Sequence, residues 1–266
     1  MLKVLPLVLA LFLGGCAGLN AATPVPISLR VAGSTSMGPA LRELGDAYQS
    51  LHPNVLVELR GGDSAAGARA LVAGDADIAA VSWRSPDEKA SAGVEAVPVA
   101  RDAVALIVHP SNHLAGLTLL QTRSIYRGEI LDWAAVGGPS AEPLVVSRED
   151  GAGTRATFDA LVMGGEQVTL NALVMPSTLS MVNYIASHAP AIGYVSMDAL
   201  TDTVRTLPVE GVVPTPSTAR AGVYHLTRVL YLYTASPAPP AVQGFVDFVL
   251  SPAGQAIVAR HHVPLR

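Results

Sequence analysis

The sequence predicts an α/β fold, and three observations point to it. Half of the 266 residues are apolar and 14% are charged, which is enough for one large hydrophobic core or two ordinary ones. The apolar segments are short and are separated by 24 glycines and 20 prolines, as in alternating strands, turns and helices. Strand and polar loop follow one another three times near the start of the chain, with a helix after the first two, and strand, loop and helix recur near its middle.

The first unit begins at Ile27. Apolar residues alternate with polar ones up to Val31, which is typical of a strand, and the pattern stops at Gly33. Apolar residues then recur at helical spacing from Leu41 to Leu51. The serine-rich segment 33–36 is therefore expected where a strand meets the N-terminus of a helix.

Two further units follow this one. Val55–Leu59 is predicted as a strand and Ala68–Val72 as a helical face, with the loop Gly61–Ser64 between them. Ile78–Val81 is predicted as a third strand that leads into the loop Ser82–Ser85. Successive units of this kind place a binding site at the carboxyl ends of the strands.

The rest of the chain continues the alternation. Ala103–Val108 is continuously apolar, which predicts a buried strand or a connection between two lobes. Other predicted elements are the strands 144–146, 192–195 and 229–233, and the helices 156–162, 179–187 and 242–250.

The N-terminus predicts export and lipidation. A basic start at Lys3 precedes an apolar run of about ten residues, Val4–Leu13, which is shorter than the roughly 20 residues that span a bilayer. The Leu-Gly-Gly-Cys segment that follows resembles the lipobox of bacterial lipoproteins, which makes residues 1–15 a signal peptide and 16–26 a tether lipidated at Cys16. The alternative is an ordinary secretory signal with an incidental cysteine.

Composition excludes several classes of function. The net charge is −4 and lysine occurs only at Lys3 and Lys89, so we expect no nucleic-acid partner. The single cysteine leaves no disulfide and no cysteine-based metal site. His261 and His262 are adjacent and cannot form a helix-face metal pair, so we interpret them as a polar tail and expect neither a metal nor another cofactor.

Four loops rich in hydroxyls and glycines stand at predicted helix starts, and two of them also contain arginine. Free N–H groups and the helix dipole favour an anion at a helix N-terminus, and glycine lets the backbone approach it closely. Arginine adds a planar set of donors that suits phosphate or sulfate. A single loop of this kind is usually an ordinary helix cap, but the recurrence favours a site for a tetrahedral oxyanion.

A colinear set of motifs resembles the phosphate-binding proteins of bacterial ABC importers. The motifs are Ala32–Ser36, Gly61–Gly67, Gly74–Ile78, Arg148–Arg155, Ala191–Val195 and Ser251–Ala256. The resemblance implies a type II periplasmic-binding-protein fold, in which each of two lobes is a mixed sheet flanked by helices and the ligand cleft lies between them. It further implies a lipid-anchored monomer that faces the periplasm or the exterior, is not an enzyme, and delivers inorganic phosphate to an ABC permease. Lobe 1 is expected at residues 27–106 and 226–266, and lobe 2 at residues 107–225.

The resemblance also implies the ligand contacts. The expected ligand-binding residues are Ser34, Thr35, Ser36, Ser64, Ser82, Arg84, Arg148, Gly151, Ala152, Gly153 and Thr154. Ala152 stands where the family often has a serine, so only its N–H is left to donate. Ser82 stands where some members have an aspartate that accepts the proton of hydrogen phosphate, and Asp63 or Glu149 is a possible substitute acceptor.

Three alternatives remain open at the level of sequence. The ligand could be sulfate, arsenate, molybdate or tungstate, or the protein could sense or scavenge phosphate without a permease. A serine hydrolase or phosphatase is the third alternative, because Gly62-Asp63-Ser64 superficially resembles a nucleophile segment. However, Ala66 occupies the final glycine position of Gly-x-Ser-x-Gly, and no histidine lies in a loop expected near Ser64.

Overall fold

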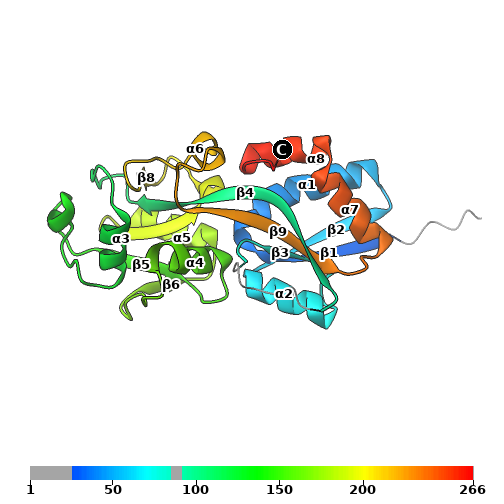
Figure 1. The fold of residues 1–266 in the computed structure, drawn as a ribbon, viewed down its shortest axis with the longest axis horizontal. Coiled ribbons are helices and arrows are strands. Elements are labelled where there is room, and N and C mark those ends of the chain that lie inside the picture. The colour runs from blue at the N-terminus through cyan, green and yellow to red at the C-terminus, as the bar shows by residue number, and fades with distance from the viewer. Residues whose placement is uncertain (1–25, 85–91, 266) are drawn as a thin grey trace, which may run out of the picture.

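The structure is a computed structural model that describes residues 26–84 and 92–265. Nine strands among these residues form one curled mixed sheet with the order β2-β1-β3-β9-β4-β7-β5-β6, and β8 pairs with β4 off this path. Figure 1 shows helices on both sides of the sheet at each end of an elongated molecule. The predicted signal peptide, the lipidation site Cys16 and all of the tether except Pro26 lie outside the described residues.

The first half of the molecule is built on three parallel strands. Ser34 at the end of β1 pairs with Gly62 at the end of β2, and Gly33 pairs with Ala80 near the end of β3. The three carboxyl ends therefore lie at one edge of the sheet. The elements of this half are β1 (Ile27–Ser34), α1 (Gly38–Leu51), β2 (Val55–Gly62), α2 (Ser64–Ala73), β3 (Ile78–Val81), α7 (Pro240–Leu250) and α8 (Pro252–His261).

One hydrophobic core holds the first half together. Leu41 and Leu44 of α1, Phe245 and Val249 of α7, and strand residues such as Leu230 belong to it. Because α7 and α8 pack on this core, the C-terminal segment of the chain is part of the fold. No single helix in residues 26–84 and 92–265 is long and apolar enough to span a membrane, although α7 and α8, bent by 65°, meet those criteria as a pair.

The second half repeats the layered arrangement around two neighbouring hydrophobic clusters. Trp133, Phe158 and Tyr194 belong to one cluster, and Met181 and Ile185 of α5 belong to the other. Its elements are α3 (Leu119–Tyr126), β5 (Leu144–Arg148), α4 (Gly153–Phe158) with a π-helical continuation (Asp159–Met163), β6 (Leu173–Met175), α5 (Thr178–Ser187), β7 (Ala191–Ser196), β8 (Arg205–Leu207) and α6 (Pro216–Arg220).

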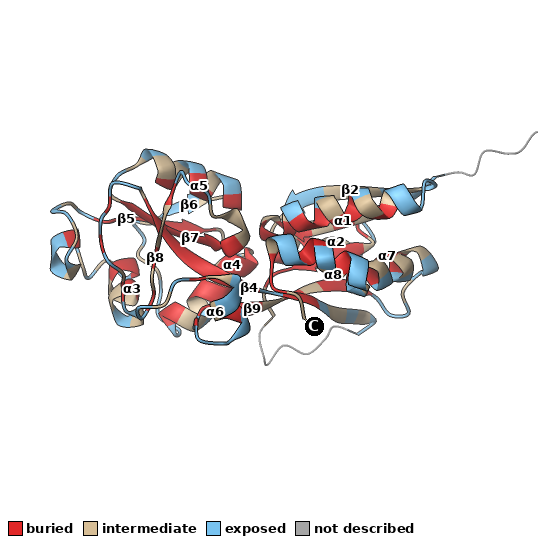
Figure 2. Cartoon of the chain, turned by 90° about the horizontal axis from the view of Figure 1, so that it is seen from above, coloured by how far each residue is buried: buried red, intermediate tan, exposed pale blue. Residues whose placement is uncertain are grey.

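Two long antiparallel strands connect the halves. They are β4 (Val94–Val108) and β9 (Thr227–Ala235), and both views show them crossing between the two parts of the molecule (Figures 1 and 2). At its start β4 pairs only with β9, and towards its end it pairs with β7 and β8. The prediction of a buried strand at 103–108 is confirmed, but this strand is the second part of a longer one.

The predicted strands and helices are found, with one misplaced boundary and one wrong interpretation. The helix expected at 156–162 begins at Gly153, and its second part is π-helical. The interpretation of His261 and His262 as a polar tail is wrong, because His261 ends α8 and His262 is buried. Apolar residues of α8 such as Ile257 and Val258 belong to the core of the first half. The helix is therefore packed against that core along the turns that lead to His261.

Candidate functional site

Four serine side chains meet at the carboxyl edge of the parallel strands, and we call Ser34, Ser36, Ser64 and Ser82 the serine cluster. Each is at most 6% exposed. The Ser34 hydroxyl donates to Ser82 Oγ at 2.8 Å and lies 2.9 Å from Ser36 Oγ. The Ser82 N–H donates to Ser64 Oγ at 3.1 Å, and the two hydroxyl oxygens are 3.3 Å apart. Three separate loops thus supply one compact group of hydroxyls.

Strand register and helix capping produce this cluster. Ser34 ends β1, Ser82 follows β3, and Ser64 begins α2 directly after the end of β2. Asp63 caps α2, with its carboxylate accepting the Ala66 N–H at 2.6 Å. The cap carboxylate is therefore held on the helix, while the next residue, Ser64, is buried in the cluster.

The second half contacts the cluster through the loop that starts α4. A Cβ on Gly153 would lie 2.3 Å from Ser82 Oγ and 2.5 Å from Ser64 Oγ, so any side chain here would collide with the cluster. The Ala65 N–H donates to the Gly151 carbonyl oxygen at 3.2 Å, which is a second contact between the halves. The two parts of the predicted site therefore touch in this structure.

Arg228 of β9 links hydroxyls from both halves. Its Nη1 donates to Thr154 Oγ1 at 2.9 Å, and its Nη2 donates to Ser36 Oγ at 3.1 Å. Because a guanidinium has no acceptor, both hydroxyl oxygens must accept from it. Each hydroxyl then keeps its own proton for another partner, so Arg228 leaves Ser36 and Thr154 able to donate.

Asp102 holds Arg228 from the opposite strand. The two residues pair directly across β4 and β9, their side chains are 0% exposed, and Arg228 donates to Asp102 Oδ2 from Nε at 2.9 Å and Nη2 at 2.7 Å. Ser196 donates to Oδ1 at 2.9 Å, and His262 Nδ1 lies 3.5 Å away. Burial alone would raise the pKa of Asp102, but Arg228 and His262 outweigh it and lower the pKa to about 2. The pair therefore stays ionised at neutral pH.

Arg148 supplies the other cation of the site, from the last residue of β5. Its side chain is 3% exposed and makes a two-point ion pair with Glu149, with distances of 2.6 and 3.0 Å. Its Nε also donates to the Met175 carbonyl oxygen at 2.9 Å. Burial lowers the pKa of Arg228, the Asp102 carboxylate opposes that, and the charge of Arg148 lowers the pKa further. Each of the two guanidinium groups is therefore paired with its own carboxylate, and the charge of Arg148 acts on Arg228.

Most of the residues predicted from sequence lie together. The serine cluster, Gly151, Gly153 and Thr154 are joined by the contacts above, and Arg148 lies within electrostatic range of Arg228. Thr35 differs, because its hydroxyl lies 3.2 Å from Thr178 Oγ1 at the start of α5. The Ala152 N–H donates to the Glu149 carbonyl oxygen at 3.0 Å and closes a turn in this arrangement, and its contact with a ligand stays a prediction.

Arg84 lines a small cavity of about 200 Å³ beside β9, together with Arg101, Arg228 and Tyr231. Arg228 also bonds to Ser36 of the serine cluster. A role for Arg84 in holding a ligand stays a prediction.

Arg228 and Asp102 were not predicted from the sequence. Each stands at the start of an apolar run, before Val229–Tyr233 and Ala103–Val108 respectively. A charged residue beside a buried strand is seldom buried unless it is paired, and here two such residues of opposite charge occur. That coincidence is the signal that would have found them.

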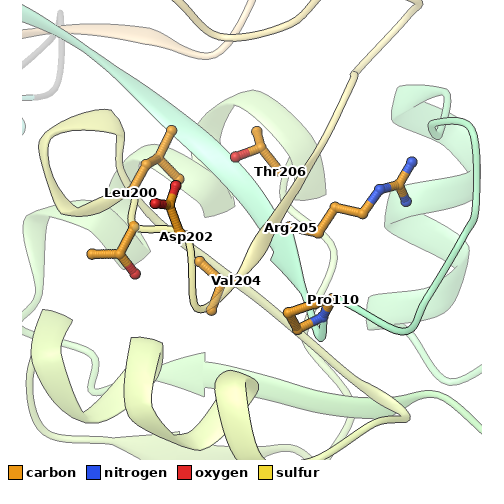
Figure 3. A pocket seen from close by; sticks show the side chains of 7 residues that line it. Pro110, Leu200, Asp202, Val204, Arg205 and Thr206 are labelled. Carbon is orange, nitrogen blue, oxygen red and sulfur yellow. The ribbon is translucent and has the colours of Figure 1, made fainter.

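Two larger cavities occur among the described residues, and one of them reaches the serine cluster at Ser34. One, of about 780 Å³, runs between the halves from the loop at Ser34 and Thr35 past Thr178 to His261. The other, of about 530 Å³, lies in the second half beside Asp202 and Arg205, and Figure 3 shows the Arg205 side chain pointing away from Asp202. Arg205 donates to the carbonyl oxygens of Asn112 and Leu114, so this second cavity offers little to an anion.

Neither a metal-binding group of side chains nor a histidine bonded to Ser64 occurs in the part of the chain that the structure describes. No group of three or more histidine, cysteine or carboxylate residues that could hold a metal occurs there. The hydrogen bonds of the Ser64 hydroxyl within residues 26–84 and 92–265 involve Ser82 and no histidine. A serine nucleophile needs an adjacent base, and Ser64 has none in this arrangement.

Comparisons with known proteins agree on one family. A model of the PBP superfamily domain matches residues 20–253. The phosphate-binding protein PstS of Pseudomonas aeruginosa is 28% identical over an alignment of 276 positions, gaps included. The alignment covers 92% of this chain and 85% of that protein. PstS of Bacillus subtilis is 26% identical over 230 residues, covering 84% of this chain and 75% of that protein.

Solved structures give the same result. A protein from Clostridium perfringens, described as a phosphate ABC transporter substrate-binding protein and crystallised with bound phosphate, is 33% identical, with a TM-score of 0.86 over 90% of this chain and 100% of that one. An ABC-type phosphate transport receptor from Vibrio cholerae is 28% identical, with a TM-score of 0.74 over 89% and 99% of the two chains. The chain has the type II periplasmic-binding-protein fold of these proteins, and it belongs to the PBP superfamily domain family.

Proposed function

We propose that this protein binds inorganic phosphate between its two halves and delivers it to an ABC importer. The observation that carries the proposal is the Arg228 guanidinium, which donates to a hydroxyl from each half at the point where the halves meet. The relatives supply the ligand, since the similar proteins are phosphate-binding proteins and phosphate transport receptors. We infer further that the lobe boundaries at residues 106 and 226 divide the chain into the two closing parts.

The proposed ligand contacts are the serine cluster, Arg148, Gly153 and Thr154, with Arg228 as a positioning residue. In the present arrangement the cluster hydroxyls bond to one another. An anion would replace these contacts, with each hydroxyl rotating its proton toward the bound oxygens. Because Gly153 touches the cluster so closely, admission of the ligand requires the halves to separate by bending of β4 and β9.

This donor set is sufficient for tight binding. A micromolar dissociation constant needs about 8 kcal/mol. Hydrogen bonds to charged groups contribute roughly 1.5–3 kcal/mol each, so about half a dozen of them cover that amount even after desolvation losses. Arg148 carries the largest share in this proposal because it is the buried cation at the end of β5, where the second half faces the cluster.

Selectivity between phosphate and sulfate depends on a proton acceptor. Ser82 occupies the cluster where some family members have an aspartate, while Asp63 caps α2 and Glu149 pairs with Arg148. A hydroxyl can accept the proton of hydrogen phosphate but does not repel sulfate as a carboxylate does. We therefore expect the preference for phosphate to be modest, and sulfate, arsenate, molybdate and tungstate remain competing ligands.

Calorimetric titration of the purified protein with phosphate and with sulfate, each at two pH values, tests the proposal. We expect micromolar or tighter phosphate binding that persists in excess sulfate with reduced apparent affinity. Binding of sulfate alone would reassign the ligand, and binding of no tetrahedral oxyanion would refute the proposed function. A colorimetric phosphatase assay on the same sample is expected to give no turnover.

The proposed location is the cell envelope, with the protein as a monomer lipidated at Cys16 and facing the periplasm or the exterior. The Leu-Gly-Gly-Cys segment supports this proposal. Labelling with radioactive palmitate is expected to mark the wild type and to leave Cys16→Ser unlabelled. Equal labelling of both would refute the anchor. Loss of phosphate uptake on deletion of a co-encoded permease would separate transport from sensing or scavenging.

A further inference from the structure

His261 lies between two carboxylates on different parts of the fold. Its Nδ1 is 2.9 Å from Asp198 Oδ1, and its Nε2 is 2.8 Å from Glu43 Oε2. Glu43 is on α1 of the first half, like His261 itself, whereas Asp198 follows β7 in the second half. The His261–Asp198 contact therefore joins the two halves.

Both contacts require the imidazolium form. A neutral imidazole has one N–H donor and one bare nitrogen, whereas an ionised carboxylate only accepts. Two carboxylates, one on each ring nitrogen, are satisfied together only when both nitrogens carry a proton. We call the present arrangement, in which the two halves touch, the closed state. The geometry thus selects the charged form of His261 in the closed state.

The surroundings of His261 favour that charge. The side chains of His261, Asp198 and Glu43 are 19%, 8% and 35% exposed, so the contacts are partly shielded from water. Burial lowers the pKa of His261, but hydrogen bonds to Glu43 and Asp198 and their charges outweigh it and raise the pKa above its ordinary value. The protonated state is therefore more stable here than in a hydrated chain.

Other charged groups face the same region, and they are arginines and carboxylates. Arg260 of α8 pairs with Glu43, and Arg42, Asp46 and Arg60 line the cavity that also contains His261. Arginines stay charged and exposed carboxylates ionise near pH 4, so between about pH 5 and 8 the charge in this region changes at His261. The adjacent His262 contacts Asp102 instead.

We propose that His261 is a positioning residue that, when protonated, latches the two halves in the closed state. The inference rests on the proposed function, because closure is what retains the anion. The direction in which pH changes the stability of the closed form follows from the raised pKa of His261 in that form. The added stability of that form is complete below the ordinary histidine pKa of about 6.5, and it is lost as pH rises through the raised value.

Phosphate titrations of the full-length wild type and His261→Gln, between about pH 5.5 and 9, test the latch. We expect the wild type to bind about fivefold more tightly than the variant at the acid end and equally at the alkaline end, which is the scale of one partly shielded charge pair. The ionisation of phosphate itself affects both proteins alike and cancels in the ratio of their dissociation constants. A ratio that does not change with pH would overturn the proposal.

Two further variants separate the latch from a general effect of mutation. Asp198→Asn removes the charged partner in the second half but keeps the contact between His261 and Glu43, so it should reproduce the loss seen with His261→Gln. His113→Gln changes an exposed histidine of the second half and should match the wild type at every pH. A wild-type profile in Asp198→Asn would contradict a link between the halves.

A readout without ligand distinguishes failure of the latch from failure of the proposed function. Small-angle X-ray scattering of the ligand-free wild type should show a more compact molecule at pH 5.5 than at pH 9, while His261→Gln should show no such change. If this contrast appears but phosphate does not bind, the latch stands and the proposed ligand fails. If both proteins have the same dimensions at both pH values, the latch is wrong whether or not phosphate binds.

Discussion

The two buried arginines of the site are held in different ways. Arg148 pairs with Glu149, its neighbour in the chain, and that carboxylate is partly open to water. Arg228 pairs with Asp102 on another strand, and both side chains are sealed from solvent. An arginine whose carboxylate partner can be hydrated again is able to bind a ligand instead. An arginine held in a fully buried ion pair also contributes to the stability of the fold. We therefore propose that Arg148 neutralises the charge of the ligand and that Arg228 aligns the hydroxyls.

The largest expected effect is the loss of stability on removal of Arg228, which forms the fully buried ion pair. Arg228→Met leaves the Asp102 carboxylate buried without its main partner, which costs about 3–5 kcal/mol of the free energy of unfolding. Urea denaturation followed by circular dichroism measures this change. Combining the substitution with Asp102→Asn should recover much of the stability but not phosphate binding. If Arg228→Met alone were as stable as the wild type, the buried pair would not have the role assigned to it.

Arg148→Ala tests the ligand side. Removing this cation should weaken phosphate binding by about 2–5 kcal/mol, or roughly 30-fold to several thousand-fold. The free energy of unfolding should change little, because Glu149 can rehydrate. Calorimetry and urea denaturation of the same sample provide both values. Wild-type affinity in a folded Arg148→Ala protein would show that the proposed site is wrong.

Gly153→Ala probes the contact between the halves. The added methyl group would collide with the Ser64 and Ser82 hydroxyls, so closure should be opposed by about 1–3 kcal/mol. We expect phosphate affinity to fall about 5- to 150-fold while each half stays folded. Gly38→Ala is the matched control, because a Cβ there meets nothing within 4 Å. Equal affinities of the two alanine variants would argue against closure at Gly153.

Thr154→Val is expected to have the smallest effect. It keeps the shape of the side chain but removes the oxygen that accepts from Arg228, so about 1 kcal/mol of binding, or roughly fivefold in affinity, should be lost. Thr154→Ser retains the hydroxyl and should bind nearly as the wild type does. If the serine variant were as weak as the valine variant, the methyl group rather than the hydrogen bond would be responsible.

Local patterns predicted the α/β class and the loops of the site, and the family resemblance implied the two-lobed fold. Ser34, Ser64 and Ser82 follow strands whose carboxyl ends were expected to share one edge, and the register places them there. The motif at Arg148 was likewise expected at the end of a strand. These features depend on residues close together in the chain, which is why periodicity and motif order were enough to find them.

Long-range pairing explains what the sequence did not predict. Arg228 and Asp102 are 126 positions apart and become partners only because β4 and β9 pair in the sheet. The histidines at the end of α8 are ordered because that helix packs on the core, and Asp198 reaches His261 from the other half. Thr35 turned toward Thr178 for a similar reason, since its partner lies 143 positions away. A local pattern can mark such residues as candidates, as the charges beside two apolar runs do at Arg228 and Asp102, but it does not show which residues become partners.

A crystal structure determined with phosphate tests most directly whether donors from both halves surround one anion. The account predicts a phosphate within hydrogen-bonding distance of the Arg148 guanidinium, of serine-cluster hydroxyls and of the Gly153–Thr154 segment, with Arg228 still bonded to Asp102. A phosphate bound to one half only, or bound elsewhere while the serine hydroxyls remain bonded to one another, would contradict it.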